Sequence, residues 1–445
     1  MRTLIVGHGG RESALAWRMA EHSELYAFAG HRNPSLVRYA DSSGGKVELG
    51  DVCDAQAVAA FARANAIDLA MISADEPLAA GVVDELLAQG TRTVGPTRAG
   101  AEIEWNKAFA RELLLEVAPE ATPRLRVLDA PSQVDRAIAS FGQTPVVVKP
   151  SGLTGGKGVK VMGPHLASHE DAAEYARSLL ADRRHGDSVL IEEKVLGAEF
   201  TIQAISDGRT VIFPPSTYDY PYRFDGDEGP GTGGMGSLTL AGPTLPFMTD
   251  AHYEQACTII ERVIARLGAE GRRFTGVMNS GFFATADGVR VIEFNARFGD
   301  PECINIMALL DGGWPEVMRR ICTGELARGD VSLRAQASLV LYLVSPDYAL
   351  PTGRPPTPRE FELDLAAIER DGCEVFFASS EQVGANAYRT IGTSRAVALA
   401  TTAPTLAQAH ERIVACAGSV DALQWRREVG DERYLAGLTG LVAQA

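Results

Sequence analysis

A short apolar strand meets a charged turn in the segment Val291-Ile292-Glu293-Phe294-Asn295-Ala296-Arg297-Phe298-Gly299-Asp300-Pro301-Glu302. Because side chains alternate between the two faces of a strand, Glu293 and Asn295 point the same way while Phe294 points into the core. Two neighbouring oxygen donors on a rigid strand suit a hard cation such as Mg²⁺, which proteins hold with one or two carboxylates and substrate phosphates. By spacing alone, an ordinary polar strand face explains the pattern equally well.

The composition is that of an ordinary globular protein and excludes several classes. A chain of 445 residues exceeds what one hydrophobic core usually serves, so about two to four domains are expected. The formal net charge of −15 argues against a nucleic-acid-binding surface, which needs basic patches. No apolar run approaches the roughly 18 residues of a membrane span, and the N-terminus shows no signal-peptide pattern. The six cysteines are scattered without a Cys-x-x-Cys pair, as in reduced thiols. We therefore expect a cytoplasmic protein with neither nucleic acid nor membrane as partner. Separately from these features, a monomer or weak homodimer is the expected assembly.

Residues 1–102 alternate between strand and helix signals. Strands are expected at 3–6, 25–28, 47–49 and 69–72, and helices at 11–21 and 55–66. This alternation predicts a parallel sheet covered by helices, and the turn Gly95-Pro96-Thr97 closes the domain.

Two further domains are expected, at residues 103–328 and 329–445. The central one opens with a helix that holds Lys107 and contains a buried strand at 146–148. Its glycine-dense segment 229–236 is expected to be a loop. The last domain has an apolar strand at 339–344, further strands near 375–378 and 396–400, and a helix over 406–417. This pattern predicts a small α+β domain.

The segment Gly7-His8-Gly9-Gly10-Arg11-Glu12 follows the first strand and opens the first helix. Glycines there let a ligand approach the backbone, and a helix N-terminus attracts an anion. The G-x-G-x-x-G spacing is absent, because Glu12 stands where the third glycine would fall, and a nicotinamide cofactor is therefore disfavoured. A small phosphorylated ligand and a plain strand-to-helix turn both remain as interpretations.

A second motif holds one lysine at the end of a strand and another in a glycine-rich loop, Lys149-Pro150-Ser151-Gly152-Leu153-Thr154-Gly155-Gly156-Lys157-Gly158-Val159. Glycines expose backbone N–H groups and allow positive φ, so such a loop can wrap phosphate oxygens while the ammonium groups neutralise their charge. The loop is not a Walker loop, because Gly158 and not Ser or Thr follows Lys157. An exposed hairpin would explain the glycines but not both lysines.

A third motif runs an apolar strand into acidic residues and a turn, Val189-Leu190-Ile191-Glu192-Glu193-Lys194-Val195-Leu196-Gly197-Ala198-Glu199. Its backbone can meet the edge of an adenine ring, and a carboxylate can hold ribose hydroxyls. Alone, the motif is also explained by a charged surface. Its position after the lysine loop favours the nucleotide interpretation.

The order of these motifs resembles the ATP-grasp superfamily and, more closely, the phosphoribosylamine–glycine ligase family. The resemblance covers essentially the full length. It rests on the three motifs above together with Pro77-Leu78, residues 81–84, Gly95-Pro96-Thr97, Lys107-Ala108-Phe109, residues 232–236 and residues 293–302.

The resemblance implies an N-terminal parallel-sheet domain, a central ATP-grasp domain and a small C-terminal α+β domain, hence an α/β and α+β multidomain protein. It implies ATP and Mg²⁺, with Mn²⁺ as the alternative ion, and a small carboxylic acid and an amine as substrates. In such enzymes the carboxylate attacks the γ-phosphoryl group of ATP, and an amine displaces phosphate from the resulting acyl phosphate.

Site residues follow from the resemblance by position. The implied nucleotide-binding residues are Lys107, Lys149, Gly155, Gly156, Lys157, Glu192, Val195 and Glu199. The implied metal ligands are Glu293 and Asn295. The implied substrate-binding residues are Gly9, Gly10, Arg11, Asp75, Asp219, Arg297, Asp300, Pro301 and Glu302. Lys157, Arg297 and Asp300 are also implied to act in catalysis.

Several residues depart from the family pattern at positions expected to face substrates. Where the family has a Lys-Arg pair, this chain reads Pro221-Tyr222, with Arg223 displaced by one position. The loss of a hydrogen bond between a substrate and a charged side chain costs about 1.5–3 kcal/mol of binding free energy. The other departures are Ser13, residues 73–76, Pro230-Gly231, Cys303-Ile304, residues 377–380 and Thr393-Ser394.

Three hypotheses therefore remain. The protein joins glycine to 5-phosphoribosylamine, or it is a specialised paralogue that joins another acid and amine by the same chemistry. The third hypothesis is a nucleotide-binding homologue that has lost catalysis. The third is disfavoured because Lys149, Lys157, Glu293 and Asn295 are all present, and a silent site has no physical need for them.

Overall fold

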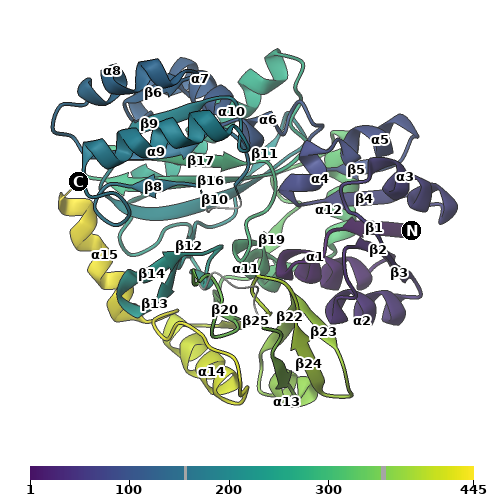
Figure 1. The fold of residues 1–445 in the computed structure, drawn as a ribbon. Coiled ribbons are helices and arrows are strands. Elements are labelled where there is room, and N and C mark those ends of the chain that lie inside the picture. The colour runs from purple at the N-terminus through teal and green to yellow at the C-terminus, as the bar shows by residue number, and fades with distance from the viewer. Residues whose placement is uncertain (155–157, 352–356, 445) are drawn as a thin grey trace.

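The computed structural model describes residues 1–154, 158–351 and 357–444 (Figure 1). We propose to divide them at about residues 102 and 328, as expected from the sequence. The N-terminal part lies on one side of the molecule and the C-terminal helix on the opposite side (Figure 1). Gly155, Gly156 and Lys157, which were assigned to phosphate binding, lie outside the described residues.

A five-stranded parallel sheet forms the N-terminal part, in the order β3-β2-β1-β4-β5. Leu4, Ile5 and Val6 are fully buried, as expected when helices cover both faces of a parallel sheet. The parallel sheet predicted from the alternating pattern is confirmed. Its elements are β1 (Arg2–Val6), α1 (Gly10–Ala20), β2 (Glu24–Ala29), α2 (Pro34–Ser43), β3 (Lys46–Leu49), α3 (Ala55–Ala64), β4 (Leu69–Ile72), α4 (Asp75–Ala79), α5 (Val82–Ala88) and β5 (Arg92–Val94).

A small antiparallel sheet follows, in the order β6-β9-β7-β8. Val146, Ala176 and Ile191 belong to a hydrophobic cluster separate from the main core. This small lobe therefore has a core of its own. Its elements are β6 (Leu125–Leu128), α8 (Val134–Ala139), β7 (Val146–Pro150), β8 (Lys160–Val161), α9 (His169–Asp182) and β9 (Val189–Glu193), and it is preceded by α6 (Glu102–Trp105) and α7 (Lys107–Val117).

The largest sheet crosses the expected boundary between the central and C-terminal parts. Its order is β17-β16-β10-β12-β15-β20-β25-β22, with β11 (Val211–Ile212) beside β10. The central part contributes β10 (Ala198–Ser206), β12 (Thr217–Asp219), β15 (Gly236–Thr239), β16 (Gly276–Thr285) and β17 (Gly288–Asn295). The C-terminal part adds β20 (Ala337–Leu343), β22 (Glu374–Phe377) and β25 (Val397–Ala403).

The remaining elements surround this sheet. The longest helix, α10, packs against β10 and β17. In the central part these elements are α10 (Asp250–Ala269), α11 (Glu302–Leu309), β18 (Leu310–Asp311) and α12 (Trp314–Thr323). In the C-terminal part they are β19 (Ser332–Leu333), β21 (Glu360–Glu362), α13 (Leu365–Arg370), β23 (Ser380–Gln382), β24 (Ala387–Thr390), α14 (Leu406–Gly418) and α15 (Glu432–Gln444).

The prediction of a loop over residues 229–236 is wrong for the first residues of this segment. Glu228–Gly231 form β14, which pairs with β13 (Tyr222–Phe224). Backbone hydrogen bonds need no side chain, so the pairing of Gly231 with Tyr222 overrides the low strand propensity of glycine.

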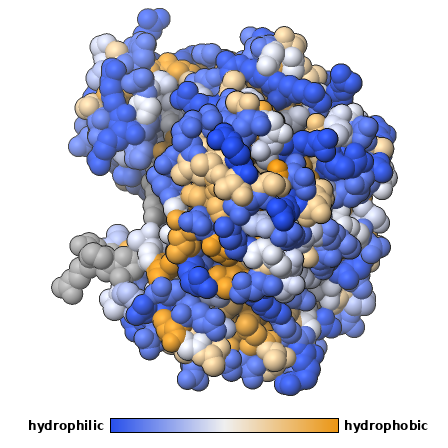
Figure 2. Space-filling model, turned by 90° about the vertical axis from the view of Figure 1, so that its right-hand side faces the viewer, coloured by the Kyte–Doolittle hydropathy of each residue, from blue (hydrophilic) through white to orange (hydrophobic). Residues whose placement is uncertain are grey.

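The surface seen from the side of the N-terminal part is mainly hydrophilic, and hydrophobic residues gather at mid-height and below it (Figure 2). Within the part of the chain that the structure describes, none of the helices combines the length and the apolar character that a membrane span requires.

A buried amide fastens α11 to the large sheet where the sheet passes from the central to the C-terminal part. Nδ2 of Asn305 donates to the Ser338 carbonyl at 3.0 Å and to the Ser237 carbonyl at 3.3 Å. The Ser237 hydroxyl in turn donates to Oδ1 of Asn305. Asn305 and both serines are fully buried, so water cannot replace these bonds.

Replacing Asn305 by alanine is expected to destabilise the fold. The Asn305→Ala variant removes the amide that bonds two serine hydroxyls and two carbonyls, and the free energy of unfolding should fall by about 2–4 kcal/mol. Urea denaturation measures this loss. Asn386→Ala, at an exposed position, is the matched control and should change the stability little. Equal stability of the two variants would contradict this account of the buried amide.

Candidate active site

Two adjoining cavities lie among the three parts of the molecule. The arginine cavity, of about 720 Å³, is lined by Arg11, Arg297 and Arg395, which come from the N-terminal, central and C-terminal parts. The apolar cavity, of about 930 Å³, is lined by apolar and charged residues of the small lobe and the large sheet. The two cavities share wall residues, which include Lys149, Glu192 and Glu293.

The apolar cavity has an apolar region and a charged region. Val147 on β7, Phe283 on β16 and Val291 with Ile292 on β17 give it apolar walls. Lys149 and Lys160 bring positive charge. A ligand with an apolar ring and an anionic tail matches this distribution of apolar surface and positive charge. Val195 and Glu199, assigned to nucleotide binding, also line this cavity.

A buried ion cluster forms the junction of the cavities. The Glu192 carboxylate meets Arg111 Nε at 2.6 Å and Lys149 Nζ at 2.8 Å. Burial alone would raise the pKa of Glu192, but the two cations lower it to about 2. Arg111 also donates to the Ile292 carbonyl of β17 at 2.7 Å. Glu192, assigned to nucleotide binding, lies in the wall of both cavities, and its carboxylate holds two cations in place there.

Lys107 lies at the start of α7 and lines the arginine cavity. Its Nζ donates to the Gly152 carbonyl at 3.0 Å, at the start of the lysine–glycine loop. Burial lowers the pKa of Lys107 from its usual value, while the neighbouring carboxylate of Glu293 counteracts the shift. The ammonium groups of Lys107 and Lys149 thus stand in the walls around the junction.

Glu293 and Asn295 offer oxygen ligands at the end of β17. Both line the arginine cavity, and Phe294 between them is buried, as the alternation predicts. Nδ2 of Asn295 lies 3.4 Å from Oε1 of Glu293. Among the described residues no group of three or more His, Cys, Asp or Glu side chains could hold a metal ion. One carboxylate and one amide oxygen fit a hard cation that takes its other ligands from phosphate and water.

Arg297 is held in place by a buried carboxylate. Its Nη2 lies 3.0 Å from Oε1 of Glu104 and donates to Oδ1 of Asn295 at 3.2 Å. The other Glu104 oxygen accepts the Ala296 N–H at 2.8 Å. Burial raises the pKa of Glu104 to about 7, although Arg297 lowers it. The Arg297 guanidinium is therefore aimed into the cavity by a group that titrates near neutral pH.

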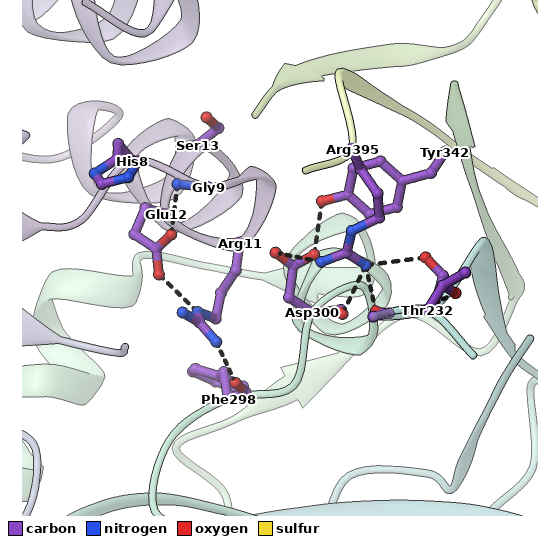
Figure 3. Close-up of polar contacts among 12 residues, drawn as sticks. His8, Gly9, Arg11, Glu12, Ser13, Thr232, Phe298, Asp300, Tyr342 and Arg395 are labelled. Atoms are coloured by element: carbon purple, nitrogen blue, oxygen red, sulfur yellow. Dashed lines mark hydrogen bonds and ion pairs between the residues drawn. The ribbon is translucent and has the colours of Figure 1, made fainter. Parts of the chain in front are cut away.

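Asp300 is fixed by two residues of the C-terminal part (Figure 3). The Tyr342 hydroxyl donates to Oδ1 at 2.6 Å, and Nη2 of Arg395 lies 3.2 Å from Oδ2. Arg395 also stacks on the Tyr342 ring at 4.1 Å and donates to the carbonyls of Gly233, Gly234 and Asp300. This cluster connects β20, the β24–β25 loop and the charged turn.

The first helix begins beside the same turn (Figure 3). Oε2 of Glu12 accepts the Gly9 N–H at 2.7 Å, so the helix caps its own N-terminus. Oε1 of Glu12 holds Arg11 Nε at 2.6 Å, and Arg11 donates to the Phe298 carbonyl at 3.0 Å. Gly7 has φ +129°, and a Cβ there would lie 2.6 Å from the Glu12 side chain, so only glycine fits.

The arginine cavity also contains two acids, of which Glu302 is buried and Asp219 is half-buried. Asp219 and Glu302 line it, and burial together with mutual repulsion raises the pKa of Asp219 well above its usual value. Burial likewise raises the pKa of Glu302. In the apolar cavity, burial and then Glu293 raise the pKa of Glu199 to about 7. Such carboxyl groups suit a cationic ligand group, which would restore their charge.

The structure brings together many of the described site residues assigned from the sequence. Asp75, with Arg11, Asp219, Arg297, Asp300 and Glu302, lines the arginine cavity. Gly9, Gly10 and Pro301 are not among the described wall residues of either cavity. Gly10 packs against Tyr342, whose hydroxyl would lie 2.1 Å from a Cβ at this position.

The departures from the family pattern fall into two groups. Ser13, Arg223, Cys303 and Ile304 are buried and are not among the described wall residues of the cavities. Arg223, for example, donates to Gln424 at 2.8 Å. The departures that do line a cavity are Asp75, Glu76, Pro221, Tyr222, Pro230, Gly231, Thr393 and Ser394.

Glu104, Arg111 and Tyr342 were not identified from the sequence. A signal existed for one of them, because Lys107 and Arg111 are four residues apart, as on one face of α7, whereas Glu104 lies on α6. Tyr342 gave no such signal, since it stands in a continuous apolar strand.

Two family models match adjacent parts of the chain. The model for the phosphoribosylglycinamide synthetase N domain matches residues 1–104, and the model for its ATP-grasp (A) domain matches residues 105–303. The phosphoribosylamine–glycine ligase of Thermococcus kodakarensis is 39% identical over 448 aligned residues, which cover 99% of either chain. That of Pyrococcus furiosus is 39% identical, with 88% of either chain covered.

Solved structures share the fold. The phosphoribosylamine–glycine ligase of Thermotoga maritima matches with a TM-score of 0.78 at 23% identity, covering 96% of this chain and 100% of that one. The biotin carboxylase domain of Hydrogenobacter thermophilus 2-oxoglutarate carboxylase, solved with MgADP and bicarbonate, matches with a TM-score of 0.73 at 14% identity, covering 98% and 95%. From the family models and the full-length relatives together, the chain belongs to the phosphoribosylamine–glycine ligase family.

Proposed function

We propose that this protein is an ATP-dependent ligase that joins the carboxyl group of glycine to the amine of 5-phosphoribosylamine. The products are glycinamide ribonucleotide, ADP and phosphate, as in purine biosynthesis. The observation that carries the proposal is the meeting of two cavities at Lys149, Glu192 and Glu293. One cavity suits a base with a phosphate tail, and the other suits polar substrates. Membership of the phosphoribosylamine–glycine ligase family supports the choice of acid and amine. The reaction is proposed to take place in the cytoplasm, with the protein as a monomer or weak homodimer.

The proposed reaction runs at the junction of the cavities. An oxygen of the glycine carboxylate attacks the γ-phosphorus of ATP, and the bond from that phosphorus to ADP breaks. Lys107 and Lys149 offset the negative charge that develops on the transferred group. The amine then attacks the acyl carbon, the bond to phosphate breaks, and the amine proton leaves with the phosphate. No side-chain nucleophile is needed.

The walls of the arginine cavity orient the substrates in this proposal. Arg297, held by Glu104, and Asp300, held by Tyr342 and Arg395, have fixed directions. Fixed groups place the carboxylate and the amine within reach of each other, which lowers the entropic part of the barrier. Arg11, Asp75, Asp219 and Glu302 are the further proposed substrate contacts, and Lys157 with its loop is proposed to close over the phosphates.

Mg²⁺ is the proposed metal ion, with Mn²⁺ as the alternative. Glu293 and Asn295 would hold it, together with phosphate oxygens of the nucleotide. A bound Mg²⁺ neutralises phosphate charge. We assign the ion to Glu293 and Asn295 because they offer one carboxylate and one amide oxygen where the two cavities meet.

A second candidate function is the ligation of another acid and amine. The observation that favours it is that Thr393, Ser394 and Tyr222, which depart from the family pattern, line the cavities. Ser13, Arg223, Cys303 and Ile304 do not support it, because they are buried outside the described walls. We therefore place the glycine reaction first.

One assay tests the proposal. Purified protein with Mg-ATP, glycine and phosphoribosylamine generated in place should release phosphate and form glycinamide ribonucleotide. Turnover with another acid or amine but not with this pair would favour the second candidate. Nucleotide binding without phosphate release from any pair would indicate a silent homologue.

Glu293→Gln is expected to reduce phosphate release by about 100-fold or more, because it removes the negative charge that the proposed site offers to a hard cation. A phosphate-release assay measures the loss, and circular dichroism should show an unchanged fold. Glu112→Gln, at an exposed position on α7, is the matched control and should keep full activity. Near-normal turnover of Glu293→Gln would remove Glu293 from the proposed metal site.

The activity is expected to fall as the pH drops from about 8 to about 6, by up to about tenfold per unit. Above pH 7 Glu104 is ionised and holds Arg297; below it, the carboxyl is protonated and the ion pair is lost. The quantity to measure is kcat/KM across this range. Glu104→Gln, which mimics the protonated form, should be less active at pH 8 and show a flattened profile. If the acid limb persists in Glu104→Gln, another group, such as Glu199, causes it.

A further inference from the structure

The C-terminal helix α15 packs against the large sheet with one face. Leu435 and Leu438 are buried, and Val442 packs against the main core. The helix contacts β10 and β16, and residues of these two strands, Glu199 and Phe283, line the apolar cavity. In Figure 1 the helix follows the edge of the molecule and ends beside the central part. The last turns of α15 therefore lie next to the apolar cavity, because the helix packs on two strands that line this cavity.

Polar contacts anchor the first turn of α15. The Tyr434 hydroxyl bonds the Tyr218 hydroxyl at 2.7 Å and both carboxylate oxygens of Asp227 at 2.9 Å. Asp227 is itself paired with Arg426 at 2.8 Å. Tyr218 lies on β12 of the large sheet, so the helix is tied to the sheet at one end. The remaining turns extend from this anchor along the helix axis.

Leu441 projects from α15 into the apolar cavity. Tyr434, Leu438 and Leu441 are spaced by four and three residues and therefore share one helical face. Leu441 lines the cavity, as does Leu196, and these side chains are 45% and 58% exposed. Both leucines are exposed although they belong to the wall of one cavity. An apolar ligand surface in the cavity would bury them and gain hydrophobic stabilisation.

We propose that α15 forms part of the nucleotide site and that Leu441 contacts the adenine base of ATP. The base is the occupant because the cavity joins apolar walls to Lys149 and Lys160, which suit the phosphate end of the same ligand. The inference rests on the proposed function in taking ATP as the ligand. It does not depend on which acid and amine are joined.

The test is the binding of ADP, with Mg²⁺ present, measured by isothermal titration calorimetry on the full-length protein. Leu441→Ala should raise the Kd about three- to tenfold, as expected for the loss of a few tens of Å² of apolar contact. Leu441→Met, which keeps an apolar side chain of similar volume, should bind nearly as well as the unchanged protein. Leu87→Ala is the matched control, because Leu87 on α5 is also 45% exposed and does not belong to the described walls.

A KM measurement adds a readout that general destabilisation would not give. In Leu441→Ala the KM for ATP should rise while the KM values for acid and amine stay constant. If Leu441→Ala binds ADP as tightly as the unchanged protein, or if the unchanged protein does not bind ADP, the inference is wrong. If the protein binds ADP and Leu441→Ala weakens binding, but glycine and phosphoribosylamine are not joined, the proposed function fails and the inference stands.

Discussion

The ion cluster around Glu192 is the constraint on which the site depends. Arg111 bonds Glu192 at the end of β9 and the Ile292 carbonyl of β17, and thereby joins the small lobe to the large sheet. Lys149 shares the same carboxylate. Charged groups this deeply buried are stable only when each has its partner, so the three side chains fix one another. Both cavities are built around this arrangement, and it places a positive charge where they meet.

Much of the fold could be predicted from the sequence, because the patterns that indicate strands and helices are local. The parallel N-terminal sheet follows from alternating strand and helix patterns, and the strand over 291–295 follows from its short apolar run. The burial of Phe294 between Glu293 and Asn295 needs only the two-residue period of a strand. The family resemblance then supplied an order of motifs, which physical spacing alone does not give.

Features that depend on contacts between distant segments could not be predicted from the sequence. From the sequence, Arg223 is a candidate for a displaced substrate-binding cation. In the structure it lies away from the cavities and bonds Gln424, about 200 residues later in the chain. Gly231 reads as loop, yet it pairs with Tyr222. Tyr342 reads as an ordinary strand residue, and its role beside Asp300 depends on how β20 meets the charged turn. A contact between residues far apart in the chain produces no periodic pattern in the sequence. A residue that belongs to a motif therefore need not lie in the site.

The separate core of the small lobe has a mechanical consequence. The large sheet continues through β15 and β20 into the C-terminal part, and moving these parts against each other would break a ladder of backbone hydrogen bonds. The small lobe has its own hydrophobic cluster and its own sheet, so it can rotate as a rigid body without exposing apolar core. Arg111 bonds Glu192 of the lobe and the Ile292 carbonyl of the large sheet, so such a rotation would act on these bonds. Lys149 and Glu192 of the lobe line both cavities, so such a rotation would move these shared walls while Arg11, Arg297 and Arg395 stay in place.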